Sequence, residues 1–116
     1  PVNGTKVGVL GLSYKANIDD IRESPAFKVI KELKKHGAEV ATYDPHVIKK
    51  SSVPSLETLL EGSQALVLVT DHREFKEVIT PELLKKYGIK VLIDGKNCLD
   101  KASFADSGII YKGIGR

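Results

Sequence analysis

Short, mostly apolar runs recur along the chain, separated by stretches in which apolar and charged residues follow helical spacing. The runs cover residues 6–12, 38–43, 64–70, 89–93 and 108–111. Runs of this kind, edged by Gly and Pro, are typical of strands that are buried on both faces of a parallel sheet. The pattern therefore predicts strands at these positions, with helices between them.

The most regular helical pattern follows Ser24 and Pro25. Serine is a preferred N-cap, and proline suits the first helical position because its missing N–H would have no partner there. Apolar residues then recur on one face as far as Leu33, and Gly37 ends the helix. Shorter helices are predicted from Ser55 through Leu60, over 72–78 with Asp71 as N-cap, and from Thr80-Pro81 to Tyr87.

This alternation predicts an α/β fold: a three-layer, Rossmann-like domain with an open, mostly parallel sheet of about five strands flanked by helices. At 116 residues the chain is expected to form a single domain, residues 1–116. It contains no methionine and begins Pro-Val-Asn-Gly, so we expect it to be an excerpt of a longer protein.

The composition is ordinary for a globular protein, with 41% hydrophobic and 28% charged residues. No apolar run approaches the roughly 18–20 residues of a membrane span, and the sequence has no signal-peptide pattern. No membrane partner is therefore expected. The single cysteine cannot form an internal disulfide and favours a reducing, cytoplasmic location.

The net charge of +3 raises the question of nucleic-acid binding. Two of the lysine pairs, 34–35 and 85–86, close predicted helices, where the helix dipole favours cations. Aromatic residues make up only 6% of the chain and do not interleave with basic residues to form a stacking platform. We therefore expect no nucleic-acid partner.

The connection between the first predicted strand and the first helix, Gly11–Pro25, is unusually long. Such connections usually run about 2–6 residues, and this one carries Lys15, Arg22 and two aspartates. Open parallel sheets bind ligands beyond the carboxyl ends of their strands, where this loop begins. A lysine and the planar fork of an arginine suit a phosphate or pyrophosphate. Two other interpretations stay open, in which Lys15 is only solvated and Arg22 braces the loop by pairing with a neighbouring aspartate, Asp19 or Asp20.

Polar residues also follow the other predicted strands and are candidates for the same edge of the sheet. They are Asp44, Asp71, His72, Asp94 and Lys96. Asp44 stands where nucleotide-binding folds place a ribose-binding acid, but the first turn lacks the Gly-x-Gly-x-x-Gly fingerprint, and Asp44-Pro45 is more often a simple turn. His72 has no Cys or His at metal-ligand spacing, so no metal site is expected.

The long loop carries a specific resemblance. Residues 9–15, Val-Leu-Gly-Leu-Ser-Tyr-Lys, followed by Asp-Ile-Arg-Glu-Ser-Pro at 20–25, resemble the signature that opens the C-terminal, UDP-sugar-binding domain of the UDP-glucose/GDP-mannose dehydrogenase family. That signature is usually Gly-x-x-Phe-Lys and then Asp-x-Arg-x-Ser-Pro. Weaker matches lie at 43–45, 70–75 and 94–97, and the closing segment 111–116 is similar to the ends of the UDP-N-acetyl-D-mannosamine dehydrogenase branch.

The resemblance implies a piece of an enzyme that oxidises the C6 hydroxyl of a nucleotide sugar to a carboxylate. In that family the oxidation takes two NAD-dependent hydride transfers, through a thiohemiacetal and a thioester on a cysteine. The cysteine and most of the NAD contacts belong to N-terminal and central domains. This chain would therefore bind the UDP-sugar without catalysing its oxidation, and the full-length enzyme would be a homodimer or a larger assembly.

Carried over by position, the resemblance implies that Tyr14 and Lys15 contact the substrate and that Arg22 reaches NAD across the domain interface. The family often has a substrate-contacting arginine after Asp-Gly, where this chain has Lys96, which lacks the bidentate fork. Tyr14 replaces the usual phenylalanine and adds a hydroxyl. No catalytic residue is expected, and Cys98 is interpreted as a packed thiol.

A function of a different class also stays open: a stand-alone flavodoxin-like or receiver-type regulatory or nucleotide-binding module. A receiver would need acidic residues at the end of the first strand to hold Mg²⁺, and this chain has Gly-Leu-Ser there, at 11–13. A self-contained NAD-dependent enzyme is disfavoured by the missing glycine fingerprint and by the size of the chain.

Overall fold

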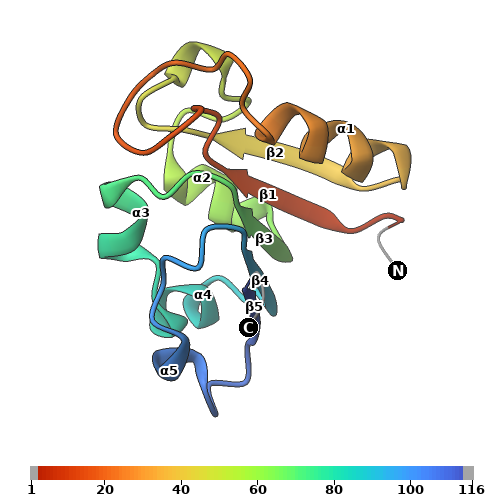
Figure 1. Ribbon diagram of the computed structural model, residues 1–116. Helices are drawn as coiled ribbons and strands as arrows, with labels where there is room; N and C mark the ends of the chain where they lie inside the picture. Colours follow the sequence, from red (N-terminus) through yellow and green to blue (C-terminus); the bar gives the residue numbers. More distant parts are fainter. Residues whose placement is uncertain (1–2, 114–116) are drawn as a thin grey trace.

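In the computed structural model, residues 3–113 are described, and they form one open sheet with helices on both faces (Figure 1). The sheet has five parallel strands in the order β2-β1-β3-β4-β5. The strands are β1 Lys6–Leu10, β2 Glu39–Tyr43, β3 Ala65–Leu68, β4 Val91–Asp94 and β5 Ile110–Gly113. The predicted three-layer, Rossmann-like α/β fold is confirmed. The last three residues of the closing motif at 111–116 and the first two of the chain lie outside the described residues.

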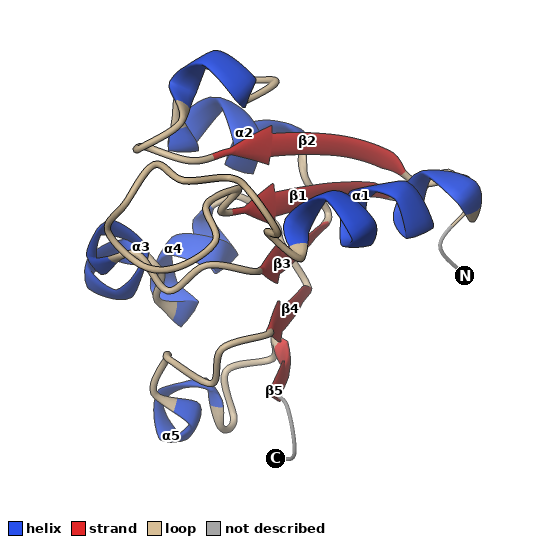
Figure 2. Ribbon diagram, turned by 45° about the horizontal axis from the view of Figure 1, so that its top comes forward, coloured by secondary structure: helices blue, strands red, loops and turns tan. Residues whose placement is uncertain are grey.

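The helices divide unequally between the two faces of the sheet. They are α1 Ala26–Lys35, α2 Leu56–Gly62, α3 Arg73–Val78, α4 Pro81–Lys86 and α5 Lys101–Phe104, with a 3₁₀ turn, η1, at Ile48–Lys50. Within the described chain, α1 covers one face and α2 to α5 cover the other (Figures 1 and 2). Right-handed crossovers require this division, because the chain moves from β1 to β2 in one direction across the sheet and from β2 onward in the other. Each helix of the described chain falls short of the length and apolar character that a membrane crossing needs.

Two apolar layers fix the helices to the sheet. On the α1 side the buried residues are Val9, Leu12, Ala26 and Val69. On the other side a larger cluster joins the inner faces of the strands to Leu59, Phe75, Leu84 and Phe104, one from each of α2 to α5. Removing this apolar surface from water is the main favourable term in the stability of the fold.

The ends of α1 follow the sequence signals closely. The hydroxyl of Ser24 accepts the backbone N–H of Ala26 at 3.2 Å, although the regular helix begins one residue later than Pro25. At the other end, Gly37 has φ +89°, and its N–H donates to the carbonyl of Lys34 while the N–H of Ala38 donates to that of Leu33. These two bonds form a Schellman motif, which satisfies carbonyls that the helix leaves unpaired.

Several boundaries differ from the prediction. Strand β1 ends at Leu10 rather than at residue 12, because Gly11 has φ +103° and turns the chain against Thr70. Asp71 is not the N-cap of α3: that position belongs to His72, whose side chain points into the core and caps nothing. Helix α5 is not among the predicted helices, although Asp100 is a typical N-cap residue. Its side chain accepts the N–H of Ala102 at 3.0 Å.

Candidate functional site

The long loop Gly11–Pro25 lies beyond the carboxyl end of β1 (Figure 2). Strand β1 lies between β2 and β3 in the sheet, and the chain leaves β1 toward β2 but leaves β3 toward β4, in opposite directions. This is the topological switch point of the sheet, and open α/β sheets bind ligands in the crevice there. The loop therefore occupies the expected ligand-binding position.

Hydrogen bonds give the loop a defined shape. The N–H of Tyr14 donates to the carbonyl of Asp20, which closes the middle of the loop. The carbonyl of Ser13 accepts the hydroxyl of Thr70 at 2.9 Å and that of Ser24 at 3.3 Å. These hydrogen bonds hold the long loop in an ordered conformation at the edge of the sheet.

Asp44 anchors the start of the loop from the end of β2. Its Oδ2 accepts the N–H of Leu12 at 2.7 Å and both the N–H and the hydroxyl of Ser13, at 2.9 and 2.8 Å. Burial alone would raise the pKa of the Asp44 carboxyl, but the hydrogen bonds from His72 and the backbone amides outweigh it and hold that pKa well below its usual range. Because the side chain is fully buried, Asp44 is a structural anchor and not the ribose-binding acid considered above.

The same segment confirms the turn predicted at Asp44-Pro45. The N–H of Val47 donates to the carbonyl of Asp44 at 3.0 Å, and the N–H of His46 donates to Oδ1 of Asp44 at 2.8 Å. The carboxylate thus stabilises its own turn while it holds the neighbouring loop.

Arg22 pairs with Asp20, not with Asp19. The carboxylate of Asp20 accepts Nε–H and Nη2–H of Arg22 at 3.1 and 2.9 Å, and the backbone N–H of Arg22 at 2.9 Å. These hydrogen bonds lower the pKa of Asp20 to about 2. The Arg22 side chain is 87% exposed, so its other edge stays available. Together with Tyr14, Asp20 and Glu23, Arg22 lines a surface hollow of about 390 Å³.

The remaining predicted binding residues are exposed but do not line this hollow. Lys15 follows Tyr14 at the surface of the loop. Lys96 lines a second hollow of about 290 Å³, against Pro25 and Val29. The structure thus brings Tyr14 and Arg22 together, whereas Lys96 lies beside the start of α1.

Asp94 is buried and does not present its carboxylate at the edge of the sheet. It accepts the N–H groups of Lys96 and Leu99 at 3.0 and 2.9 Å and the hydroxyl of Tyr111 at 2.6 Å, and so it folds the segment that follows β4. Burial, together with the negative charges of Asp94 and Asp71, raises the pKa of the Cys98 thiol to about 12. A thiol that stays protonated agrees with the interpretation of Cys98 as a packed side chain.

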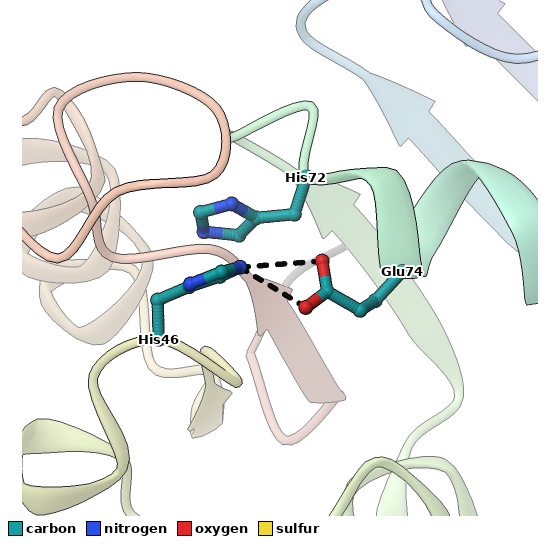
Figure 3. Close-up of side chains that lie close together, drawn as sticks. All are labelled: His46, His72 and Glu74. Atoms are coloured by element: carbon teal, nitrogen blue, oxygen red, sulfur yellow. Dashed lines mark hydrogen bonds and ion pairs between the residues drawn. The ribbon is translucent and has the colours of Figure 1, made fainter.

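The structure also assembles a cluster that sequence spacing could not show: His46, His72 and Glu74 (Figure 3). Their potential ligand atoms lie within 4.8 Å of one another. His46 Nε2 lies 3.0 Å from Oε2 of Glu74. The imidazole rings of His46 and His72 lie with their centroids 4.4 Å apart and their planes tilted by 35°.

His72 is nevertheless unsuited to hold a metal ion. Its Nδ1 accepts the backbone N–H of Asn17 at 2.8 Å, which requires a lone pair on that nitrogen. Its Nε2 therefore carries the proton in the neutral ring and donates to Oδ2 of Asp44 at 2.9 Å. A metal ion would have to displace one of these two hydrogen bonds. Without His72 the cluster keeps only two ligands.

Comparison with known proteins adds an independent finding. Residues 8–101 match the family described as "UDP-glucose/GDP-mannose dehydrogenase family, UDP binding domain". The chain is 42% identical over 110 residues to a UDP-N-acetyl-D-mannosamine dehydrogenase of Pyrococcus horikoshii, covering 95% of this chain and 25% of that protein. It is 33% identical over 128 residues to a UDP-glucose 6-dehydrogenase of Rhizobium meliloti, covering 99% of this chain and 28% of that protein.

A solved structure agrees with these matches. The crystal structure of an NDP-N-acetyl-D-galactosaminuronic acid dehydrogenase from Methanosarcina mazei superimposes with a TM-score of 0.90 at 31% identity, covering 99% of this chain and 25% of that one. The chain thus spans about a quarter of the length of the relatives that it matches. By the family match over most of its length, the chain belongs to the UDP-glucose/GDP-mannose dehydrogenase family and corresponds to its UDP binding domain.

Proposed function

We propose that this chain is the C-terminal, UDP-sugar-binding domain of an NAD-dependent nucleotide-sugar 6-dehydrogenase. The complete enzyme would oxidise the C6 hydroxyl of the sugar to a carboxylate. Relatives named as UDP-N-acetyl-D-mannosamine and UDP-glucose 6-dehydrogenases support this proposal, and the chain spans 25% and 28% of two of them. The reacting groups would come from the remaining N-terminal and central domains, so the chain alone binds but does not catalyse.

The observation that carries the proposal is the exposure of Tyr14 and Lys15 on an anchored loop at the switch point of the sheet. The Lys15 ammonium is a point charge suited to the diphosphate of a UDP-sugar. Two unit charges about 4 Å apart interact by roughly 4 kcal/mol at an effective dielectric of 20, so one lysine can orient the nucleotide. Lys96 would add a second positive charge from the loop after β4.

Arg22 would contact NAD across the interface with the other domains. The residues present fit this role, because the guanidinium is held on one edge by Asp20 while the side chain stays 87% exposed. A planar fork with free donors suits a pyrophosphate. NAD, when bound, accepts the hydride that leaves the sugar. Most of its contacts would come from the domains beyond this chain.

A flavodoxin-like or receiver-type module is the second candidate function, because the strand order β2-β1-β3-β4-β5 is that of flavodoxin and of receiver domains. Fold alone does not decide function. Because residues 11–13 supply no carboxylate at the end of β1, the site of a receiver is not built here. We therefore favour the dehydrogenase domain, acting in a cytoplasmic enzyme that forms a homodimer or a larger assembly.

Titration of UDP into the isotopically labelled 116-residue protein tests where the nucleotide binds. Backbone amide resonances should shift at residues 13–22 and 94–97. Shifts confined to Asp71, His72 and helix α3 would contradict the placement. A titration with uridine alone is the control, since it lacks the diphosphate that Lys15 is proposed to bind.

The role of Lys15 is tested in the full-length enzyme. Lys15→Ala should raise the KM for the nucleotide sugar by about 10- to 100-fold, since a hydrogen bond to a charged group contributes about 1.5–3 kcal/mol. Lys31→Ala, which removes an exposed lysine of α1, is the matched control. An unchanged KM in Lys15→Ala would refute the assignment.

A further inference from the structure

The segment that carries Tyr14 and Lys15 is fastened at both of its ends. At its start, Oδ2 of Asp44 accepts the N–H groups of Leu12 and Ser13 at 2.7 and 2.9 Å. At its end, Nδ1 of His72 accepts the N–H of Asn17 at 2.8 Å. The two exposed residues thus lie between two hydrogen-bonded anchors.

The two anchors are joined to each other inside the core. His72 Nε2–H donates to the same Oδ2 of Asp44 at 2.9 Å, and both side chains are fully buried. Since the aspartate is an acceptor and the Asn17 amide is a donor, the hydrogen bonds on its two sides fix the His72 ring in one orientation and one tautomer. Only a ring with its proton on Nε2 satisfies both partners.

Asn17 makes a second hydrogen bond to the segment that contains His72. Asn17 has φ +61°, a left-handed conformation that Asn adopts more readily than most residues other than glycine. Its side-chain Oδ1 accepts the N–H of Arg73 at 2.9 Å, next to His72 at the start of α3. The end of the segment is therefore fastened to the segment that follows β3, on the other side of the switch point.

We propose that His72 is a positioning residue for nucleotide-sugar binding. The ring accepts the Asn17 N–H through Nδ1 and donates from Nε2 to Asp44. These two hydrogen bonds fix the positions of Tyr14 and Lys15. His72 is buried and touches no ligand; it acts through the loop. This inference rests on the proposed function, because it assumes that Tyr14 and Lys15 bind the substrate.

Two substitutions, each of which can replace one ring nitrogen, test the two hydrogen bonds of His72 separately. In His72→Asn the amide oxygen can take the place of Nδ1 and keep the Asn17 contact, whereas in His72→Gln the terminal amide can take the place of Nε2 and keep the Asp44 contact. We expect His72→Gln to raise the KM for the nucleotide sugar about tenfold in the full-length enzyme, which corresponds to about 1.4 kcal/mol, because the Asn17 amide loses its acceptor. His72→Asn should stay within about threefold of the wild type, which the same relation converts to less than 1 kcal/mol. Both variants should leave kcat and the KM for NAD nearly unchanged.

The outcomes distinguish this inference from the proposed function. If Lys15→Ala raises the KM but the two His72 variants do not differ, His72 only supports the fold and the inference is wrong. If Lys15→Ala has no effect, the proposed role of Lys15 in binding the nucleotide sugar fails. A parallel loss of kcat and of affinity in both variants would also refute the positioning role.

A measurement on the unmutated protein covers the case in which the variants do not fold. The ¹⁵N resonances of His72 should show an unprotonated Nδ1 and a protonated Nε2. Saturation with UDP should shift the Nδ1 resonance together with the Asn17 amide. A Nδ1 resonance that is unchanged by saturating UDP would overturn the proposal.

Discussion

The carboxylate of Asp20 accepts two hydrogen bonds from one edge of the Arg22 guanidinium, at 3.1 Å from Nε and 2.9 Å from Nη2. The two residues lie two positions apart on an exposed loop, and the backbone N–H of Arg22 joins the same carboxylate. An arginine held in this way loses little further freedom when it binds an anion, which favours recognition of a pyrophosphate.

The first prediction concerns Arg22. In the full-length enzyme, Arg22→Ala should raise the KM for NAD about tenfold, because a hydrogen bond to a charged group contributes about 1.5–3 kcal/mol. The KM for the nucleotide sugar should change little. Steady-state kinetics with each substrate varied in turn measures both constants. A defect limited to the sugar would contradict the assignment, and Arg73→Ala, which removes another exposed arginine, is the control.

The pairing itself predicts a titration. The carboxyl of Asp20 should titrate with a pKa of about 2 in the wild type, because Arg22 donates hydrogen bonds to its charged form. In Arg22→Ala that pKa should return toward its ordinary value of 3.8. Carbon-detected NMR of the side-chain carboxyl between pH 1.5 and 6 follows both curves. The same pKa in both proteins would show that the Arg22 side chain does not lower it.

The buried Asp44 carboxylate predicts a pH-dependent loss of stability. Asp44→Asn should lower the free energy of unfolding near neutral pH by about 3–5 kcal/mol. The substitution removes the negative charge that accepts hydrogen bonds from Leu12, Ser13 and His72. The folded pKa of Asp44 lies below its unfolded value, so this contribution is complete above the unfolded pKa, about 3.9, and is lost as the pH falls toward the folded pKa. The difference between the two proteins should therefore shrink below about pH 4.

Urea unfolding at several pH values measures that difference. Asp19→Asn, at an exposed position in the loop, is the control and should change stability by no more than about 0.5 kcal/mol. A difference that stays constant down to pH 2 would mean that the Asp44 charge does not stabilise the fold.

Substitution of Gly11 tests the turn that starts the long loop, and substitution of Gly62 in α2 is the control. A Cβ at Gly11 would lie 2.5 Å from Cβ and Oγ1 of Thr70, at a φ of +103°. Gly11→Ala should therefore destabilise the protein by about 2–4 kcal/mol, as strain and overpacking add. Gly62→Ala, where nothing lies within 4 Å, should be neutral or stabilising by up to about 1 kcal/mol. Equal melting temperatures for the two variants would contradict the close approach.

The sequence by itself determined the order and type of most elements, because each local signal had a local cause. Apolar runs produced the strands of a parallel sheet, and Gly37 ended α1 through bonds that span only a few residues. The motif in the loop Gly11–Pro25 also identified the family, which the match over residues 8–101 confirmed. The roles of Tyr14, Lys15, Lys96 and Arg22 stay predictions.

The tertiary structure alone decided what happens to the polar residues at the ends of the strands. Asp44, His72 and Asp94 had the residue types and positions of ligand-binding groups, yet all three are buried and bind the protein itself. Burial and partners depend on contacts between segments far apart in the chain, such as the one between Asp44 and His72. Sequence spacing carries no record of those contacts, so only the folded chain separates an anchor of the loop from a ligand of the nucleotide.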